Sequence, residues 1–154
     1  MKSITSFKRF ACLAIVMLFL SSCEIETQKD KYEEQILGTW EFSEVKSLKL
    51  FDNQTITSDY EETLLEFLSD GTVNILDKDA MTVLAAGNWD MDDETQSNGE
   101  NTTTYVSLET RFDDNYNGVD YSFNESTITR FKDGDLCFKE NKFSKNKSVE
   151  LKRF

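Results

Sequence analysis

The stretch LLEFLSDGTVNIL, residues 64–76, decides the fold class of this chain. Two apolar runs flank Asp70-Gly71, and Asp-Gly between apolar runs is the strongest short-range signal for a β-hairpin. Val73 and Ile75 alternate with polar neighbours, so the second run has one dry face and one wet face. The stretch therefore predicts two antiparallel strands packed on one side against a core.

The same signals recur from Thr39 onward. Lys132-Asp133-Gly134-Asp135 separates a second pair of apolar runs, and no helical period is long enough to compete with strands. Further strands are expected at 40–50, 83–91, 105–112, 126–131, 136–139 and 149–152. About eight strands predict an all-β fold, a single small antiparallel meander barrel that is either filled by side chains or holds one ligand.

Two stretches are expected to lie outside this regular pairing. Residues 92–101 are polar and acidic, which predicts an irregular loop. Residues 139–154 concentrate Lys and Arg, which predicts a pair of basic strands at an open sheet edge, where charge discourages pairing with other chains.

The N-terminal segment, residues 1–22, has the layout of a signal peptide. Three basic residues precede an apolar run at 10–20, whose 11 residues fall short of the about 20 that a membrane-spanning helix needs. Leu20-Ser21-Ser22-Cys23 resembles a bacterial lipobox, in which cleavage occurs directly before the cysteine. There are two alternatives: the segment is retained as a transmembrane helix, or ordinary signal cleavage leaves Cys23 as a free thiol.

Lipidation is expected at Cys23. Its thiol would carry diacylglycerol and its freed amine an acyl chain such as palmitate, and two or more chains hold a protein stably on a membrane. The acidic residues that follow also resemble an export signal of surface lipoproteins in Gram-negative bacteria. The sequence therefore predicts a lipid-anchored protein of the outer membrane, on its periplasmic or cell-surface face.

The mature chain is divided into an anchor segment and one domain. Residues 23–35 are expected to be the lipidated cysteine and a polar tether, with Asp30 capping one or two helical turns that stop at Gly38. Residues 36–154 are expected to form the barrel domain. Once residues 1–22 are removed, the thiol of Cys137 has no cysteine partner except the lipidated one, so the barrel must be stable without a disulfide.

Charge and composition exclude several functions. The mature chain has 14 basic and 29 acidic residues, a net charge of −15, which makes nucleic acid an unsuitable partner. The chain has no His, and therefore no Ser-His-Asp or Cys-His catalytic arrangement and no His-based zinc site. We expect no enzymatic activity and no cofactor.

A weak calcium candidate lies at Asp113, Asn115 and Asn117. With Gly118, these residues fit the first half of a calcium-binding loop, in which oxygen ligands alternate along the chain. The match then ends, because Asn124 stands where a bidentate Glu is needed. Turn preferences of Asp, Asn and Gly between two strands explain the same residues.

Strand alternation predicts which side chains point into the barrel, without deciding whether they meet there. A filled core and an apolar pocket are both open. The residues expected to line such a pocket are Phe42, Phe67, Val73, Ile75, Trp89, Val106, Leu108 and Phe138.

Three motifs carry a family resemblance. LGTWEF at 37–42, LEFLSDGTV at 65–73 and GNWDM at 87–91 together resemble the lipocalin-like lipoproteins common in Bacteroidetes, over about residues 36–154. In lipocalins the first Trp closes one barrel end and packs against an Arg from a late strand. The resemblance implies that Trp40 has this role, with Arg130 or Arg153 as its partner.

The resemblance also implies a function. It predicts a membrane-anchored protein that binds a small apolar or amphipathic ligand. The alternative is a noncatalytic accessory lipoprotein whose filled barrel is a platform for protein or glycan contacts.

Overall fold

A computed structural model of the chain describes residues 27–48, 53–97, 99, 101–140 and 146–154. The expected signal peptide and Cys23 lie outside the described residues. The described elements are helix α2 (Gln28–Ile36), a short 3-10 helix η1 (Thr57–Asp59), and strands β1 (Gly38–Leu48), β2 (Asn53–Thr55), β3 (Thr63–Phe67), β4 (Thr72–Asp77), β5 (Val83–Ser97), β6 (Thr102–Arg111), β7 (Phe123–Lys132), β8 (Asp135–Glu140) and β9 (Asn146–Arg153).

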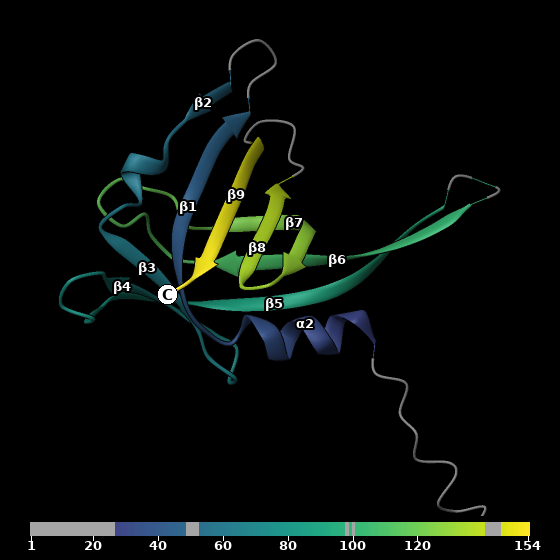
Figure 1. Cartoon of the computed structure of the whole chain (residues 1–154), viewed down its shortest axis with the longest axis horizontal. Helices are drawn as coiled ribbons and strands as arrows, with labels where there is room; N and C mark the ends of the chain where they lie inside the picture. The colour runs from purple at the N-terminus through teal and green to yellow at the C-terminus, as the bar shows by residue number, and fades with distance from the viewer. Residues whose placement is uncertain (1–26, 49–52, 98, 100, 141–145) are drawn as a thin grey trace, which may run out of the picture.

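The strands form a closed antiparallel meander. Each strand from β3 to β9 pairs with the next, β1 pairs with β3, and the pairing of β1 with β9 closes the sheet. The short strand β2 pairs only with β1 and stands outside the ring (Figure 1). The prediction of an all-β, eight-stranded meander barrel is confirmed.

The two Asp-Gly hairpins form where the sequence places them. Phe67 pairs with Val73 across the first, and Gly71 adopts a positive φ of 82°. In the second, Asp133 and Gly134 have φ values of 56° and 85°, the backbone that a tight two-residue hairpin turn between twisted strands requires. Local turn chemistry therefore fixes the register of both hairpins.

The interior of the barrel is packed with side chains. Buried apolar residues from all eight ring strands form one continuous cluster. Aromatic rings meet edge to face within it, with Phe123 and Phe138 centroids 5.0 Å apart. A barrel of eight strands is just wide enough for inward side chains to fill, and these side chains do so.

Two sequence-based predictions are wrong. Strand β9 is not at an edge, because it pairs with β8 on one side and with β1 on the other. The predicted loop at 92–101 is replaced at 92–97 by strand. These residues continue β5, which pairs with β6 from Thr102 onward as a ribbon that extends beyond the barrel (Figure 1). Polar composition indicated a loop, but polar residues suit a ribbon with two wet faces equally well.

Among the glycines, Gly87 has the least room for a side chain. A Cβ there would stand 2.3 Å from the backbone oxygen of Arg111 and 2.8 Å from the Phe112 ring. We expect Gly87→Ala to lower the free energy of unfolding by about 3 kcal/mol, because a backbone atom cannot rotate away. Gly99→Ala is the control: it meets nothing within 4 Å and has only the strain of a φ of +81°, about 1 kcal/mol. Urea unfolding measures both; equal losses would contradict the steric explanation.

Candidate functional site

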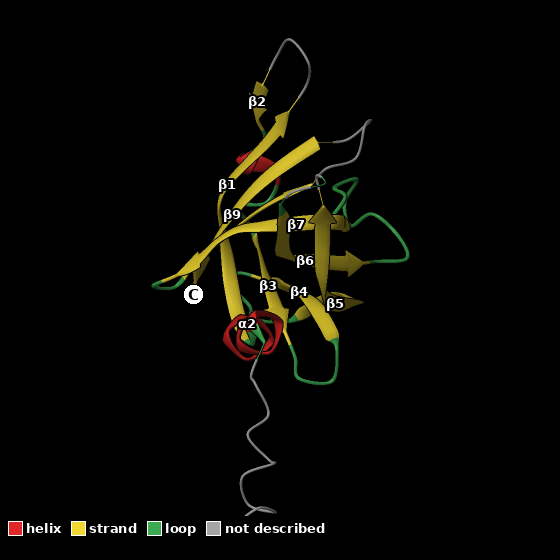
Figure 2. Cartoon of the chain, turned by 90° about the vertical axis from the view of Figure 1, so that its right-hand side faces the viewer, coloured by secondary structure: helices red, strands yellow, loops and turns green. Residues whose placement is uncertain are grey.

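Helix α2 lies along one end of the barrel, beside β5 (Figure 2). Its N-terminus is stabilised by a capping box: the Thr27 side chain accepts from the Asp30 backbone N–H at 3.2 Å, and the Asp30 carboxylate accepts from the Thr27 N–H at 2.8 Å. The bonds that the Thr27 N–H and hydroxyl donate to the Asp30 carboxylate lower the pKa of Asp30. The helix was expected to be capped by Asp30 itself; the cap residue is Thr27, because Asp30 occupies the third helical position.

The C-terminus of α2 is held by the barrel. The last carbonyls of a helix have no partner within the helix. Here the indole N–H of Trp40 donates to the Ile36 carbonyl at 2.6 Å, and the Arg153 guanidinium donates to the carbonyls of Gln35 and Leu37. A cation at this position also suits the negative end of the helix dipole.

Trp40 and Arg153 also contact one another. The guanidinium carbon lies 4.1 Å from the indole centroid, within cation–π range, and the two residues are register partners in the β1–β9 pair. Gly38 makes the approach possible, since a Cβ there would lie 2.8 Å from an Arg153 nitrogen. Of the two arginines that the resemblance left open, the structure places Arg153 over Trp40. Arg130 lies elsewhere, 3.5 Å from both Asp135 and Glu150.

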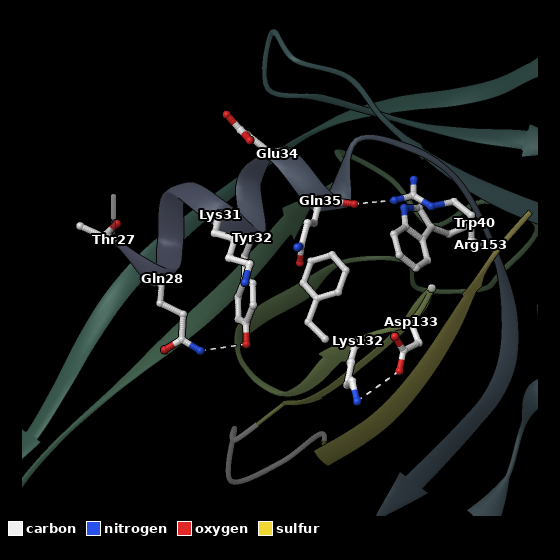
Figure 3. Close-up of a pocket in the computed structure, with 12 residues that line it drawn as sticks. Thr27, Gln28, Lys31, Tyr32, Glu34, Gln35, Trp40, Lys132, Asp133 and Arg153 are labelled. Carbon is white, nitrogen blue, oxygen red and sulfur yellow. Dashed lines mark hydrogen bonds and ion pairs between the residues drawn. The ribbon is translucent and has the colours of Figure 1, made fainter. Parts of the chain in front are cut away.

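A pocket of about 720 Å³ opens between α2 and the β7–β8 turn (Figure 3). Its apolar wall consists of Tyr32 and Phe131, whose ring centroids are 5.0 Å apart, with Trp40 5.8 Å from Phe131. Its rim is polar and charged, with Gln28 donating to the Tyr32 hydroxyl at 2.8 Å. The other lining residues are Thr27, Lys31, Glu34, Gln35, Lys132, Asp133, Gly134 and Arg153.

The sequence did not identify this pocket. Tyr32 comes from the expected tether, whereas Phe131 and Lys132 come from the end of β7, and they meet only because α2 folds back on the barrel. The available signal was an aromatic residue within the tether, which a freely solvated linker does not need. A ring with polar substituents fits the combination of aromatic wall and charged rim.

The residues expected to line an interior pocket lie instead in the packed core. Seven of them are at most 7% exposed and contact the other core residues: Phe42, Phe67, Val73, Ile75, Val106, Leu108 and Phe138. Trp89 is only partly buried. Its indole N–H donates to the Leu68 carbonyl at 2.9 Å, and its ring lies at a shallower pocket of about 370 Å³ beneath the same helix.

The opposite end of the barrel holds a polar network. The Tyr60 hydroxyl donates to the Asp120 carbonyl at 3.1 Å, and the Lys147 ammonium donates to the same carbonyl at 2.8 Å. The hydroxyls of Thr63 and Tyr121 share a hydrogen bond of 2.8 Å. Burial is the main cause that raises the pKa of Tyr60 and of Tyr121.

The calcium candidate residues lie in the connection between β6 and β7. Asn117 and Gly118 have φ values of 50° and 79° between the bridged residues Tyr116 and Val119. This is the geometry that an Asn-Gly turn adopts between antiparallel strands. Turn chemistry thus explains Asn117 and Gly118. Among the described residues, no group of three or more acidic or cysteine side chains is arranged to hold a metal ion.

The fold and the pocket define a class: a small, filled antiparallel β-barrel with one end covered by an N-terminal helix. Comparison of the chain with protein-family models, with curated protein sequences and with solved structures found no match. Within the described part of the chain, no helix has the length and apolar character needed to cross a membrane.

The helix cap predicts unequal effects for two arginines on the late strands β7 and β9. We expect Arg153→Ala to lower the free energy of unfolding by about 2 kcal/mol, because it removes two charge-assisted bonds to helix carbonyls and the contact with Trp40. Arg130→Ala loses ion pairs of a half-exposed guanidinium and its contact with Cys137, but no bond to the helix, and is expected to change stability less. Urea unfolding followed by Trp fluorescence measures both, and a larger loss for Arg130→Ala would contradict this assignment.

The buried tyrosine predicts a loss of stability in alkali. The folded protein keeps the Tyr60 proton at pH values where the unfolded chain loses it, near the ordinary pKa of 10.0, so the folded state binds more protons there. Stability is therefore fully present below about pH 10 and falls as the pH rises above that value. Unfolding free energies at pH 8 and 11 should differ less in Tyr60→Phe than in the natural protein; an unchanged difference would contradict the prediction.

Proposed function

We propose that this chain is a lipid-anchored, lipocalin-like lipoprotein of the outer membrane, noncatalytic, whose filled barrel is a platform for contacts with other molecules. One observation carries the proposal. The residues that would line an interior ligand site are packed against each other, so the inside of the barrel is occupied by the protein itself. Recognition must then use the outside of the molecule.

The arrangement at Trp40 supports the lipocalin-like part of the proposal. The resemblance implies a Trp from the first strand packed against an Arg from a late strand. Trp40 comes from β1 and Arg153 from the last strand, with 4.1 Å between guanidinium and indole. Arg153 lies outside the three motifs that carry the resemblance, so the contact supports the resemblance independently of them.

The proposed anchor also gives the barrel an orientation. Three residues lie between Cys23 and the described Thr27, so the four steps from one to the other span at most about 14 Å in an extended chain. Lipid on Cys23 would therefore hold the helix-covered end of the barrel close to the membrane. The Tyr60 end, at the opposite end of the barrel, would stand farther from it, accessible to partners.

A second function is favoured by the pocket beneath α2. A small amphipathic molecule could bind between the Tyr32–Phe131 wall and the charged rim without entering the barrel. The cationic side chains Lys31 and Lys132 on that rim would suit an anionic substituent. This alternative keeps the expectation of a small ligand but moves its site from the interior to the surface.

Native mass spectrometry of the full-length protein, extracted gently from its host membrane, tests both functions. The platform function predicts a polypeptide that begins at a lipidated Cys23 and carries no other organic mass. Cys23→Ser should lose the lipid mass and leave the membrane fraction. A bound organic mass that the natural protein carries and Phe131→Ser does not would support the surface pocket. A bound mass that Phe131→Ser still carries, and that is released only on unfolding, would show an interior ligand and contradict the platform function.

A further inference from the structure

The ribbon of β5 and β6 has two edges with different chemistry (Figure 1). The pairs between these strands continue to Ser97 and Thr102, whereas the pairing of β6 with β7 begins only at Ser107. Within the described chain, the far edge of Thr102–Tyr105 therefore has no strand beside it. Its outward amide and carbonyl groups are free to pair with an added strand.

The two edges differ in protection against such pairing. Along β5, four of the five residues at 90–94 are carboxylates, and charges of this kind blunt the part of the edge nearer the barrel; residues 95–97, opposite Thr102–Thr104, are uncharged. The β6 edge reads Thr-Thr-Thr-Tyr at 102–105, with no charge and no proline. Thr and Tyr have high strand propensity, so this edge is suited to pairing.

Carboxylates cluster on one face of the ribbon, from Glu94 opposite Tyr105 toward the barrel, and not beside Thr102–Thr104. A shallow pocket of about 190 Å³ beside Ser107 and Arg111 is lined by Asp90, Asp92, Glu94, Glu109 and Glu125. Two cations offset part of this charge: Arg111 pairs with Glu109, and Lys29 lies 3.9 Å from Asp92. Net negative charge remains at the surface next to β6.

Tyr105 joins the edge to this acidic surface. Its hydroxyl donates to Glu94 at 2.8 Å, and its pKa is raised first by that bond and also by the charge of Glu125. Glu125 sits in a bulge of β7 with a φ of 47°, where the register against β6 shifts. Bulges redirect side chains, and this one, opposite Glu109, adds a carboxylate to the same acidic surface.

From this juxtaposition we propose that the β6 edge at Thr102–Tyr105 binds an extended, basic segment of a partner protein by adding it as a strand. Alternate side chains of the added strand would lie on the same face as Tyr105 and Thr103, within reach of Glu94 and Glu125. Lys or Arg at those positions would be attracted, and acidic residues repelled. A second copy of this chain is a poorer occupant because the mature chain carries a net charge of −15.

This inference names the partner class of the proposed platform and rests on it, but its test involves neither Cys23 nor the barrel interior. The probe is a fluorescent nine-residue peptide, KVKTKVKTK, added to the full-length protein in detergent, as extracted from its host and whether or not it carries lipid. Two control peptides separate charge from strand pairing: EVETEVETE reverses the charge, and KVKPKVKPK keeps the charge but cannot form a continuous strand.

Two measurements are made with these peptides. Fluorescence polarisation at low salt should show binding of KVKTKVKTK at least about tenfold tighter than of either control. Hydrogen exchange should show new protection of amides at 102–105 on binding. Equal binding of the proline peptide would show charge attraction alone and would overturn the proposal. Protection of amides only in another region would also overturn it. So would dimers that form at this edge without any peptide.

Protein variants complete the test. Glu125→Lys should weaken binding of the basic peptide about tenfold and favour the acidic one. Thr103→Pro and Thr104→Pro are made separately, because adjacent strand amides point to opposite edges, so that one faces β5 and the other the open edge. The variant that keeps the natural melting temperature should lose peptide binding. Full binding in both proline variants, or in Glu125→Lys, would overturn the proposal.

Discussion

The antiparallel pairing of β1 with β9 is the contact on which the rest of the structure depends. It runs from Trp40 and Arg153 to Leu48 and Asn146, and it joins the first strand to the last. Without it the strands would form an open, twisted sheet with two exposed edges. With it, each inward face meets the others, and the apolar side chains that alternation predicts become a single core.

Closure also determines where the helix ends. Because Trp40 and Arg153 are register partners, their side chains arrive together at the rim, where both can donate to carbonyls of residues 35–37. The helix is short and polar, with Ile36 as its one buried residue among those described, so packing alone would hold it weakly. Its position, and therefore the pocket beneath it, depends on the backbone bonds made by these two side chains.

Much of the fold could be predicted from the sequence because hairpin signals act locally. The turn preferences of Asp70-Gly71 and Asp133-Gly134 are properties of the residues themselves, so both turns can be predicted from the local sequence. The pocket could not be predicted in this way, since Tyr32 and Phe131 are about a hundred positions apart and meet through the fold of α2. The choice between Arg130 and Arg153 needed the β1–β9 register, and the choice between filled and open barrel needed side-chain volumes in three dimensions.

Filling the barrel has a consequence for the surface. An eight-stranded barrel with large aromatic residues inside gains stability from their packing, but it leaves no interior volume for a guest. Specificity then depends on features that the barrel itself does not need. The ribbon beyond the core is one: residues 94–97 and 102–104 contribute little burial, and the pairing of β5 with β6 alone holds them. A two-stranded ribbon is marginal by itself, and a third strand would stabilise it. Because the ribbon buries so little surface, it contributes little to the core. For the same reason it is the part of the sheet whose stability would increase most on pairing with a partner strand.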